Sequence, residues 1–131
     1  MAPRVLLLVR HGEYYHHLSP DGSCLTPTGK GQAESVAEAL KDMPERPPVC
    51  RIMSSTMQRA KETAAVIHKH FPDVPLEEDA FLEEGSPDTP STASRFDWVY
   101  RTYFIQNDSP DISKTEVIVC HANIIRYLIC R

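Results

Sequence analysis

The stretch VLLLV at Val5–Val9 is the part of the sequence that decides the fold. A short, continuous apolar run is typical of a strand buried on both faces, as in a parallel sheet. Two further strands are predicted at Val49–Met53 and Glu116–Cys120, and Leu76–Leu82 reads as partly extended. These segments predict a mainly parallel sheet.

Helices are predicted between the strands. Thr26 and Pro27 suit the N-cap and first position of a helix, and apolar residues follow at helical spacing up to Leu40. The other predicted helices follow the N-cap candidates at 54–56, cover Ala93–Gln106, and begin at Ala122. Strands that alternate with helices in this way indicate an α/β fold.

The composition limits the classes of protein. A chain of 131 residues predicts one domain, residues 1–131, and its net charge of −4 argues against nucleic-acid and membrane partners, which need clustered cations. The four cysteines contain no CxxC pair, and no apolar run approaches the ~18–20 residues of a membrane span. The N-terminus has no targeting pattern, so we expect a soluble, cytoplasmic protein with reduced thiols.

Residues that carry chemistry follow the three clear strands directly. Arg10 and His11 come after the first strand, Arg59 lies just beyond the second, and His121 follows the third. Ligands of parallel sheets bind beyond the carboxyl ends of the strands, so these side chains are expected to meet. Arginines and helix N-termini at one edge favour an oxyanion such as phosphate, and histidine can act as a nucleophile.

These motifs resemble the histidine phosphatase superfamily, which includes the cofactor-dependent phosphoglycerate mutases. The similarity spans nearly the whole chain in family order, most closely to the mitochondrial phosphoglycerate-mutase-like Ser/Thr protein phosphatases. The segments that carry it are Arg10-His11-Gly12-Glu13, residues 25–33, Ser54-Ser55 with Arg59-Ala60 and Glu62-Thr63, Leu82-Glu83-Glu84-Gly85, and residues 119–127.

The resemblance implies a three-layer α/β sandwich with helices on both faces of the sheet. It also implies that His11 attacks phosphorus and forms a phosphohistidine, which water then hydrolyses. The groups expected to bind the phosphate are Arg10, Gly12, Arg59, His121 and Asn123, with His121 also counted as catalytic. No cofactor and no metal are expected, because arginines do the work that Mg²⁺ does elsewhere.

Glu84 is the expected proton donor to the leaving group, and the adjacent Glu83 is the alternative. True mutases carry a long insertion before the second histidine, whereas only residues 60–120 separate Arg59 from His121 here. Hydrolysis is therefore favoured over mutase chemistry. The resemblance suggests phosphoserine or phosphothreonine proteins, or a small phosphomonoester, as substrate. It also suggests a homodimer and, as an alternative to the cytoplasm, a mitochondrial location.

Two other interpretations stay open at this point. Cys120 and Arg126 have the C-x5-R spacing of cysteine-dependent phosphatases, although the loop between them contains no glycine to wrap a phosphate. The chain also stops at Arg131, where the family continues with a further strand. We therefore expect a C-terminally truncated domain, which leaves an inactive interaction module as the alternative to an enzyme.

Overall fold

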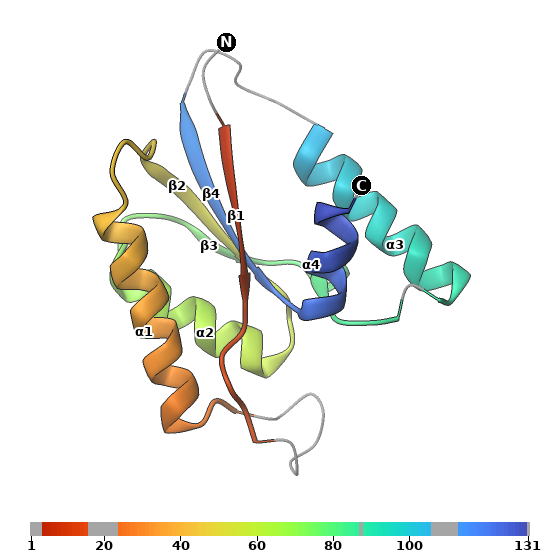
Figure 1. The fold of residues 1–131 in the computed structure, drawn as a ribbon, viewed down its shortest axis with the longest axis horizontal. Helices are drawn as coiled ribbons and strands as arrows, with labels where there is room; N and C mark the ends of the chain where they lie inside the picture. Colours follow the sequence, from red (N-terminus) through yellow and green to blue (C-terminus); the bar gives the residue numbers. More distant parts are fainter. Residues whose placement is uncertain (1–3, 16–23, 87, 106–112, 131) are drawn as a thin grey trace.

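The computed structural model describes residues 4–15, 24–86, 88–105 and 113–130. Strands and helices alternate along it (Figure 1). In chain order the elements are β1 (Arg4–Arg10), α1 (Pro27–Asp42), β2 (Val49–Ser54), α2 (Gln58–Lys69), β3 (Leu76–Glu78), the 3₁₀ turn η1 (Ala80–Leu82), α3 (Pro90–Tyr100), the π-helical turn η2 (Arg101–Ile105), β4 (Lys114–Cys120) and α4 (Ala122–Ile129). The predicted α/β fold is confirmed.

The four strands form one parallel sheet in the order β1-β4-β2-β3. β4 is buried almost throughout and lies between β1 and β2. Residues 4–9 of β1, by contrast, are only half-buried, so the expectation that Val5–Val9 is a strand buried on both faces is wrong. The reason is that β1 is an edge strand of the described sheet.

Helices cover both faces of the sheet, as the three-layer prediction requires. α1 and α2 lie on one face, and α3 and α4 lie on the other (Figure 1). Side chains of β4 alternate between the two layers: Val117 and Val119 pack toward the first helix pair, whereas Ile118 and Cys120 pack toward the second. Each face thus has its own apolar core.

The helix boundaries follow the sequence signals with two exceptions. Thr26 caps α1 through its side-chain oxygen, which accepts a hydrogen bond from the Gly29 N–H at 3.0 Å. α2, however, begins at Gln58 with no side-chain cap, because its N-cap residue is Met57, whose side chain has no oxygen to accept a hydrogen bond. The predicted third helix starts three residues earlier than expected, and its last residue, Gln106, lies outside the described residues.

The carboxyl ends of β1, β4 and β2 are joined by backbone hydrogen bonds. The His11 N–H donates to the Cys120 oxygen at 3.1 Å, and the Ser55 N–H donates to the Val119 oxygen at 3.0 Å. The loops that follow these three strands are therefore held side by side. Within the described part of the chain, no helix has the length and apolarity needed to cross a membrane.

Candidate active site

His11 lies directly beyond the end of β1, with its two ring nitrogens in different environments. Nδ1 is 2.9 Å from the Gly12 carbonyl oxygen, which can only accept, so Nδ1 carries the proton. In the neutral ring the Nε2 lone pair then accepts a hydrogen bond from Nε of Arg59. Burial lowers the pKa of His11, and the nearby positive charges of Arg59 and Arg10 lower it further. The lowered pKa thus favours the neutral form of the imidazole.

Arg59 brings a buried positive charge to this nitrogen. It is 7% exposed, and its Nε lies 3.3 Å from Nε2 of His11. Its guanidinium group also lies 4.6 Å from the centre of the Tyr14 ring, which in turn contacts His11 edge-on at 5.2 Å. A cation on an aromatic face is stabilised there, so Tyr14 holds Arg59 next to His11.

His121 lies on the other side of His11, with the two ring centres 5.0 Å apart. Its side chain is completely buried, and Nε2 is 2.9 Å from the Ser55 hydroxyl oxygen. Its Nδ1 is one of two buried side-chain polar atoms in the described residues that have no hydrogen-bond partner; the other is Nε of Arg51. Burial first, and the charges of His11 and Arg59 next, lower the pKa of His121 to about 3.

Gly12 is required by packing between the loop after β1 and helix α1. A Cβ on Gly12 would lie 2.5 Å from the Gly29 carbonyl oxygen, and a Cβ on Gly29 would lie 2.0 Å from the Glu13 carbonyl oxygen. The Gly12 N–H donates to the Thr63 hydroxyl at 3.0 Å. The close approach expected of Gly12 therefore exists, but its partner in the structure is the backbone of α1.

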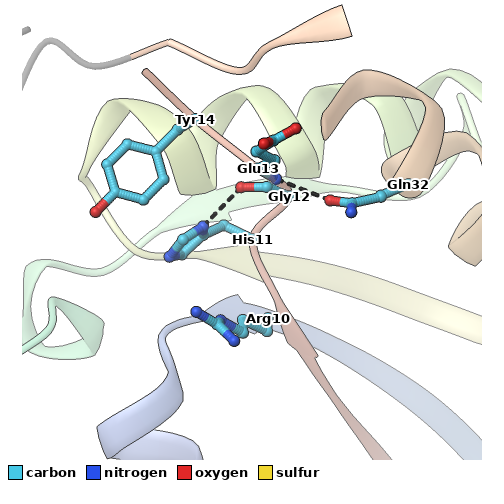
Figure 2. A pocket seen from close by; sticks show the side chains of 6 residues that line it. All are labelled: Arg10, His11, Gly12, Glu13, Tyr14 and Gln32. Atoms are coloured by element: carbon cyan, nitrogen blue, oxygen red, sulfur yellow. Dashed lines mark hydrogen bonds between the residues drawn. The ribbon is translucent and has the colours of Figure 1, made fainter. Parts of the chain in front are cut away.

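Arg10 extends from the last position of β1 into the solvent-exposed part of the site. Figure 2 shows His11 between Tyr14 and the guanidinium group of Arg10. Together with Gly12 and Glu13, these residues line a cavity of about 370 Å³. The cavity is large enough for a phosphoryl group, and Arg10 brings a positive charge to its lining.

Glu84 joins the site from the loop that precedes α3. Its carboxylate accepts hydrogen bonds from the N–H groups of Asn123 at 3.0 Å and Ile124 at 3.3 Å, the first turn of α4. The negative charge of Glu84 also acts on the pKa of His11, in the opposite direction from the arginines. Glu84 is thus close enough to His11 to belong to its electrostatic environment.

Glu83 has different contacts. Its carboxylate is hydrogen-bonded to the Thr56 hydroxyl in the loop after β2. Arg95 of α3 holds the backbone of both glutamates, because its guanidinium group donates to the carbonyl oxygens of Phe81, Glu83 and Glu84 at 2.8, 2.5 and 3.3 Å. The acid loop is therefore fixed to α3, and of its two carboxylates only Glu84 acts on the His11 pKa.

Asn123, expected to bind phosphate, is engaged by protein groups in this structure. Its Nδ2 donates to the Gly85 oxygen at 3.2 Å, and its Oδ1 accepts from Arg126 at 3.2 Å. Its contacts fasten α4 to the acid loop. The other four expected phosphate-binding residues, and both expected catalytic histidines, lie around the ends of β1, β2 and β4.

Cys120 lacks the properties of a nucleophilic thiol. Its side chain is completely buried in the core below α4, and burial raises the pKa of its thiol to about 12. A cysteine-dependent phosphatase needs a thiolate within a loop of N–H groups. Arg126, the other half of that motif, is exposed and bonded to Asn123. The geometry therefore argues against the C-x5-R alternative.

Three residues of the site were missed as functional candidates: Tyr14, Ser55 and Thr63. Ser55 and Thr63 lie inside the motif segments, but a hydroxyl residue near a strand end or on a helix has many structural uses. Tyr14 is a single aromatic residue in a loop. Only the folded structure reveals that all three contact the His11, Arg59 or His121 region.

The family comparison matches the geometry. The histidine phosphatase superfamily (branch 1) matches residues 6–93. A Caenorhabditis elegans protein, "Serine/threonine-protein phosphatase Pgam5, mitochondrial", is 37% identical over 99% of this chain and 50% of its own length. The human protein of the same kind is 31% identical over the same shares. The chain thus spans about half the length of the curated relatives it matches.

Solved structures show the same fold. A phosphoglycerate mutase from Plasmodium falciparum superposes with a TM-score of 0.78 at 36% identity, covering 100% of this chain and 69% of that one. The protein histidine phosphatase SixA, complexed with tungstate, superposes with a TM-score of 0.70 over 95% of this chain and 74% of that one. At 17% identity this second likeness concerns the fold alone.

Proposed function

The chain belongs to the histidine phosphatase superfamily, and we propose that it hydrolyses phosphomonoesters through a phosphohistidine formed on His11. The observation that carries the proposal is the state of the His11 ring. Nδ1 donates to the Gly12 carbonyl oxygen, and the lone pair of Nε2 accepts a hydrogen bond from Nε of Arg59. A neutral imidazole fixed in this tautomer is suited to attack phosphorus.

The proposed reaction has two displacements. In the first, the lone pair of His11 Nε2 forms a bond to phosphorus, the ester P–O bond breaks, and the leaving oxygen takes a proton from Glu84. In the second, Glu84 takes a proton from water and the water oxygen bonds to phosphorus. The P–N bond breaks, and its electron pair returns to Nε2 of His11. Arg10, Arg59 and His121 would stabilise the charge on the phosphoryl oxygens in both transition states.

His121 supports this role through its one unpartnered nitrogen. A buried polar atom without a protein partner is costly, and such atoms in native structures often belong to functional sites. The ring centre is 5.0 Å from that of His11, so a phosphoryl group on His11 would lie within its reach. We propose that Nδ1 of His121 donates to a phosphoryl oxygen.

For the substrate we propose phosphoserine or phosphothreonine in proteins. The support comes from the curated relatives, whose names describe Ser/Thr-protein phosphatases, and from their 31–37% identity over almost the whole of this chain. The names also favour the mitochondrion over the cytoplasm as the location. A homodimer stays a prediction, which sedimentation equilibrium of the purified chain would test.

The test compares hydrolysis of an aryl phosphate and a phosphothreonine peptide by the natural chain, His11→Ala and Cys120→Ser. We expect activity to be lost in His11→Ala, kept in Cys120→Ser and unaffected by a chelator. Mass spectrometry of rapidly quenched enzyme should locate one added phosphoryl group on His11. Loss of activity in Cys120→Ser alone, in a folded protein, would contradict the proposal. An inactive but folded natural chain would favour an interaction module.

The assignment of the acid can be tested with the matched pair Glu84→Gln and Glu83→Gln. A proton donor matters most when the leaving group is basic. We expect Glu84→Gln to slow hydrolysis of the phosphothreonine peptide about 100-fold, within the usual range for general acid catalysis, and of the aryl phosphate much less. The reverse pattern, with Glu83→Gln the selective variant, would move the role to Glu83.

A further inference from the structure

A second cavity, of about 340 Å³, lies at the opposite end of the sheet from His11. Arg4 and Lys114, the first residues of β1 and β4, line it together with Arg51 of β2 and Glu116. Arg4 and Arg10 are the two ends of a seven-residue strand. At the rise of an extended chain these ends are about 20 Å apart, so the second cavity is separate from the candidate active site.

Three positive side chains converge on one carboxylate in this cavity. Arg4 donates to both oxygens of Glu116, at 3.0 and 3.3 Å, Arg51 donates at 3.1 Å, and Lys114 Nζ lies at 3.6 Å. Only 4% of the Glu116 side chain is exposed. The arrangement keeps Glu116 ionised, and it leaves an excess of two positive charges among the residues that line the cavity.

Other acids near the cavity are already engaged or stand in solvent. Asp79 accepts hydrogen bonds from the Tyr103 hydroxyl at 2.5 Å and the Phe81 N–H at 2.9 Å. Glu77, on β3, is exposed. Glu116 already receives three hydrogen bonds and an ion pair, so it offers little further capacity to the cations. Partly buried cations without a matching anion are unfavourable, and a second anion would offset this cost.

An unpartnered donor marks the cavity. Nε of Arg51 is buried without a hydrogen-bond partner, and within the described residues only Nδ1 of His121 shares this property. The two atoms lie at opposite ends of the sheet, and Arg51 itself lines the second cavity. Since arginine is well suited to planar or tetrahedral oxyanions, the second cavity has the donors and the charge of an anion site.

We propose that this cavity binds a compact oxyanion, a phosphate or carboxylate group, through Arg51, Arg4 and Lys114. The site is distinct from the proposed catalytic centre and does not depend on its chemistry. An oxyanion held there would add negative charge beside Glu116, so the cations must be shared between the two anions. Binding is therefore expected to be weak, at phosphate concentrations on the order of 10 mM, and sensitive to salt.

The experiment is a titration of the ¹⁵N-labelled natural chain with inorganic phosphate at constant ionic strength, followed by two-dimensional NMR. We expect two groups of amides to shift with separate saturation curves: residues 11–13, 55–59 and 121–123 at the candidate active site, and residues 50–51, 102–103 and 114–116 at the second cavity. Shifts confined to the first group would overturn the proposal, whatever the outcome for catalysis.

Variants of the cations test whether these side chains cause the second saturation curve. Lys114→Met removes one charge at the weakest contact to Glu116, and Arg51→Met removes the unpartnered donor. Loss of one charge-assisted contact should raise the dissociation constant at this site about tenfold. The control is Arg101→Met, whose side chain is 74% exposed and forms an ion pair with Asp97. If Arg51→Met does not fold, the test rests on Lys114→Met. An unchanged dissociation constant at the second cavity in Lys114→Met overturns the proposal.

A parallel titration with acetate separates the two sources of oxyanion. Shifts of the same second group with acetate, at similar concentrations, would assign a carboxylate such as an acidic side chain. Shifts with phosphate alone would assign a phosphate group.

Discussion

The hydroxyl of Thr63 connects the loop that carries His11 and Gly12 to helix α2, and its removal is predicted to weaken both stability and activity. Thr63 is 1% exposed. Its oxygen accepts a hydrogen bond from the Gly12 N–H at 3.0 Å, and its proton is donated to the Arg59 carbonyl oxygen at 2.9 Å. One side chain therefore links the residue that follows His11 with the arginine that contacts it.

Thr63→Val keeps the shape of the side chain and removes both hydrogen bonds. The Arg59 carbonyl stays within the α2 hydrogen-bond ladder, but the Gly12 N–H is left buried without a partner. An orphaned buried donor costs about 1–3 kcal/mol. For a chain of this length, about 2 kcal/mol corresponds to a fall in Tm of roughly 6–10 °C. Thr63→Ser keeps the oxygen and loses a methyl group, which costs about 1 kcal/mol.

Urea unfolding gives the stability of the three proteins, and amide hydrogen exchange at Gly12 reports the bond itself. We expect faster exchange at Gly12 in Thr63→Val but not in Thr63→Ser, and a lower kcat in Thr63→Val only, because the His11 ring is anchored on the Gly12 carbonyl. If Thr63→Val matches the natural protein in stability and in Gly12 exchange, the Thr63 bond does not hold this loop.

Three more outcomes are expected. Gly29→Ala places a Cβ 2.0 Å from a backbone oxygen of the loop after β1, and it should destabilise the protein by about 2 kcal/mol in urea unfolding. In the control Gly31→Ala, no atom lies within 4 Å of the added Cβ, so the change should be neutral or stabilising. Ser55→Ala frees the His121 ring and should lower kcat/KM about tenfold. Ser54→Ala removes a hydroxyl that donates to the Ser55 carbonyl oxygen, and it should change kcat/KM less than about twofold. The free energy of unfolding should fall as the pH drops from about 6.5 toward about 3, by up to about 1.4 kcal/mol per pH unit. The reason is that His121 binds a proton in the unfolded chain over this range, whereas the buried ring of the folded protein, with its pKa of about 3, stays neutral. Urea titrations at several pH values should show a smaller slope for His121→Gln.

The sheet, and the convergence of the site residues at one of its edges, could be predicted because both depend on strong local signals. Apolar runs mark β1, β2 and β4, and each begins or ends within two residues of its predicted boundary. The rule that ligands bind beyond strand ends then brings Arg10, His11, Arg59 and His121 together. Thr26 and Pro27 start α1 as expected, since capping is encoded within a few residues.

The parts that escaped prediction depend on contacts between distant segments. No local pattern shows that Glu84 bonds to the first turn of α4, or that Gly29 must accommodate the loop after β1. The half-burial of Val5–Val9 also depends on strand order, which hydrophobicity does not reveal. The second cavity was not predicted, because Arg4, Arg51 and Lys114 meet only in the sheet.

The strand order has a consequence for how the protein is made. β1 pairs with β4 along its whole length, although the bonded pair Arg4 and Glu116 is 112 residues apart in sequence. β4, which lies between β1 and β2, is therefore synthesised after both of its neighbours, and a nascent chain carries an unpaired apolar β1 until β4 emerges. Parallel pairing over such separations is slow, so folding is expected to be late and exposed to aggregation. His11 meets His121 only when synthesis of both β1 and β4 is complete.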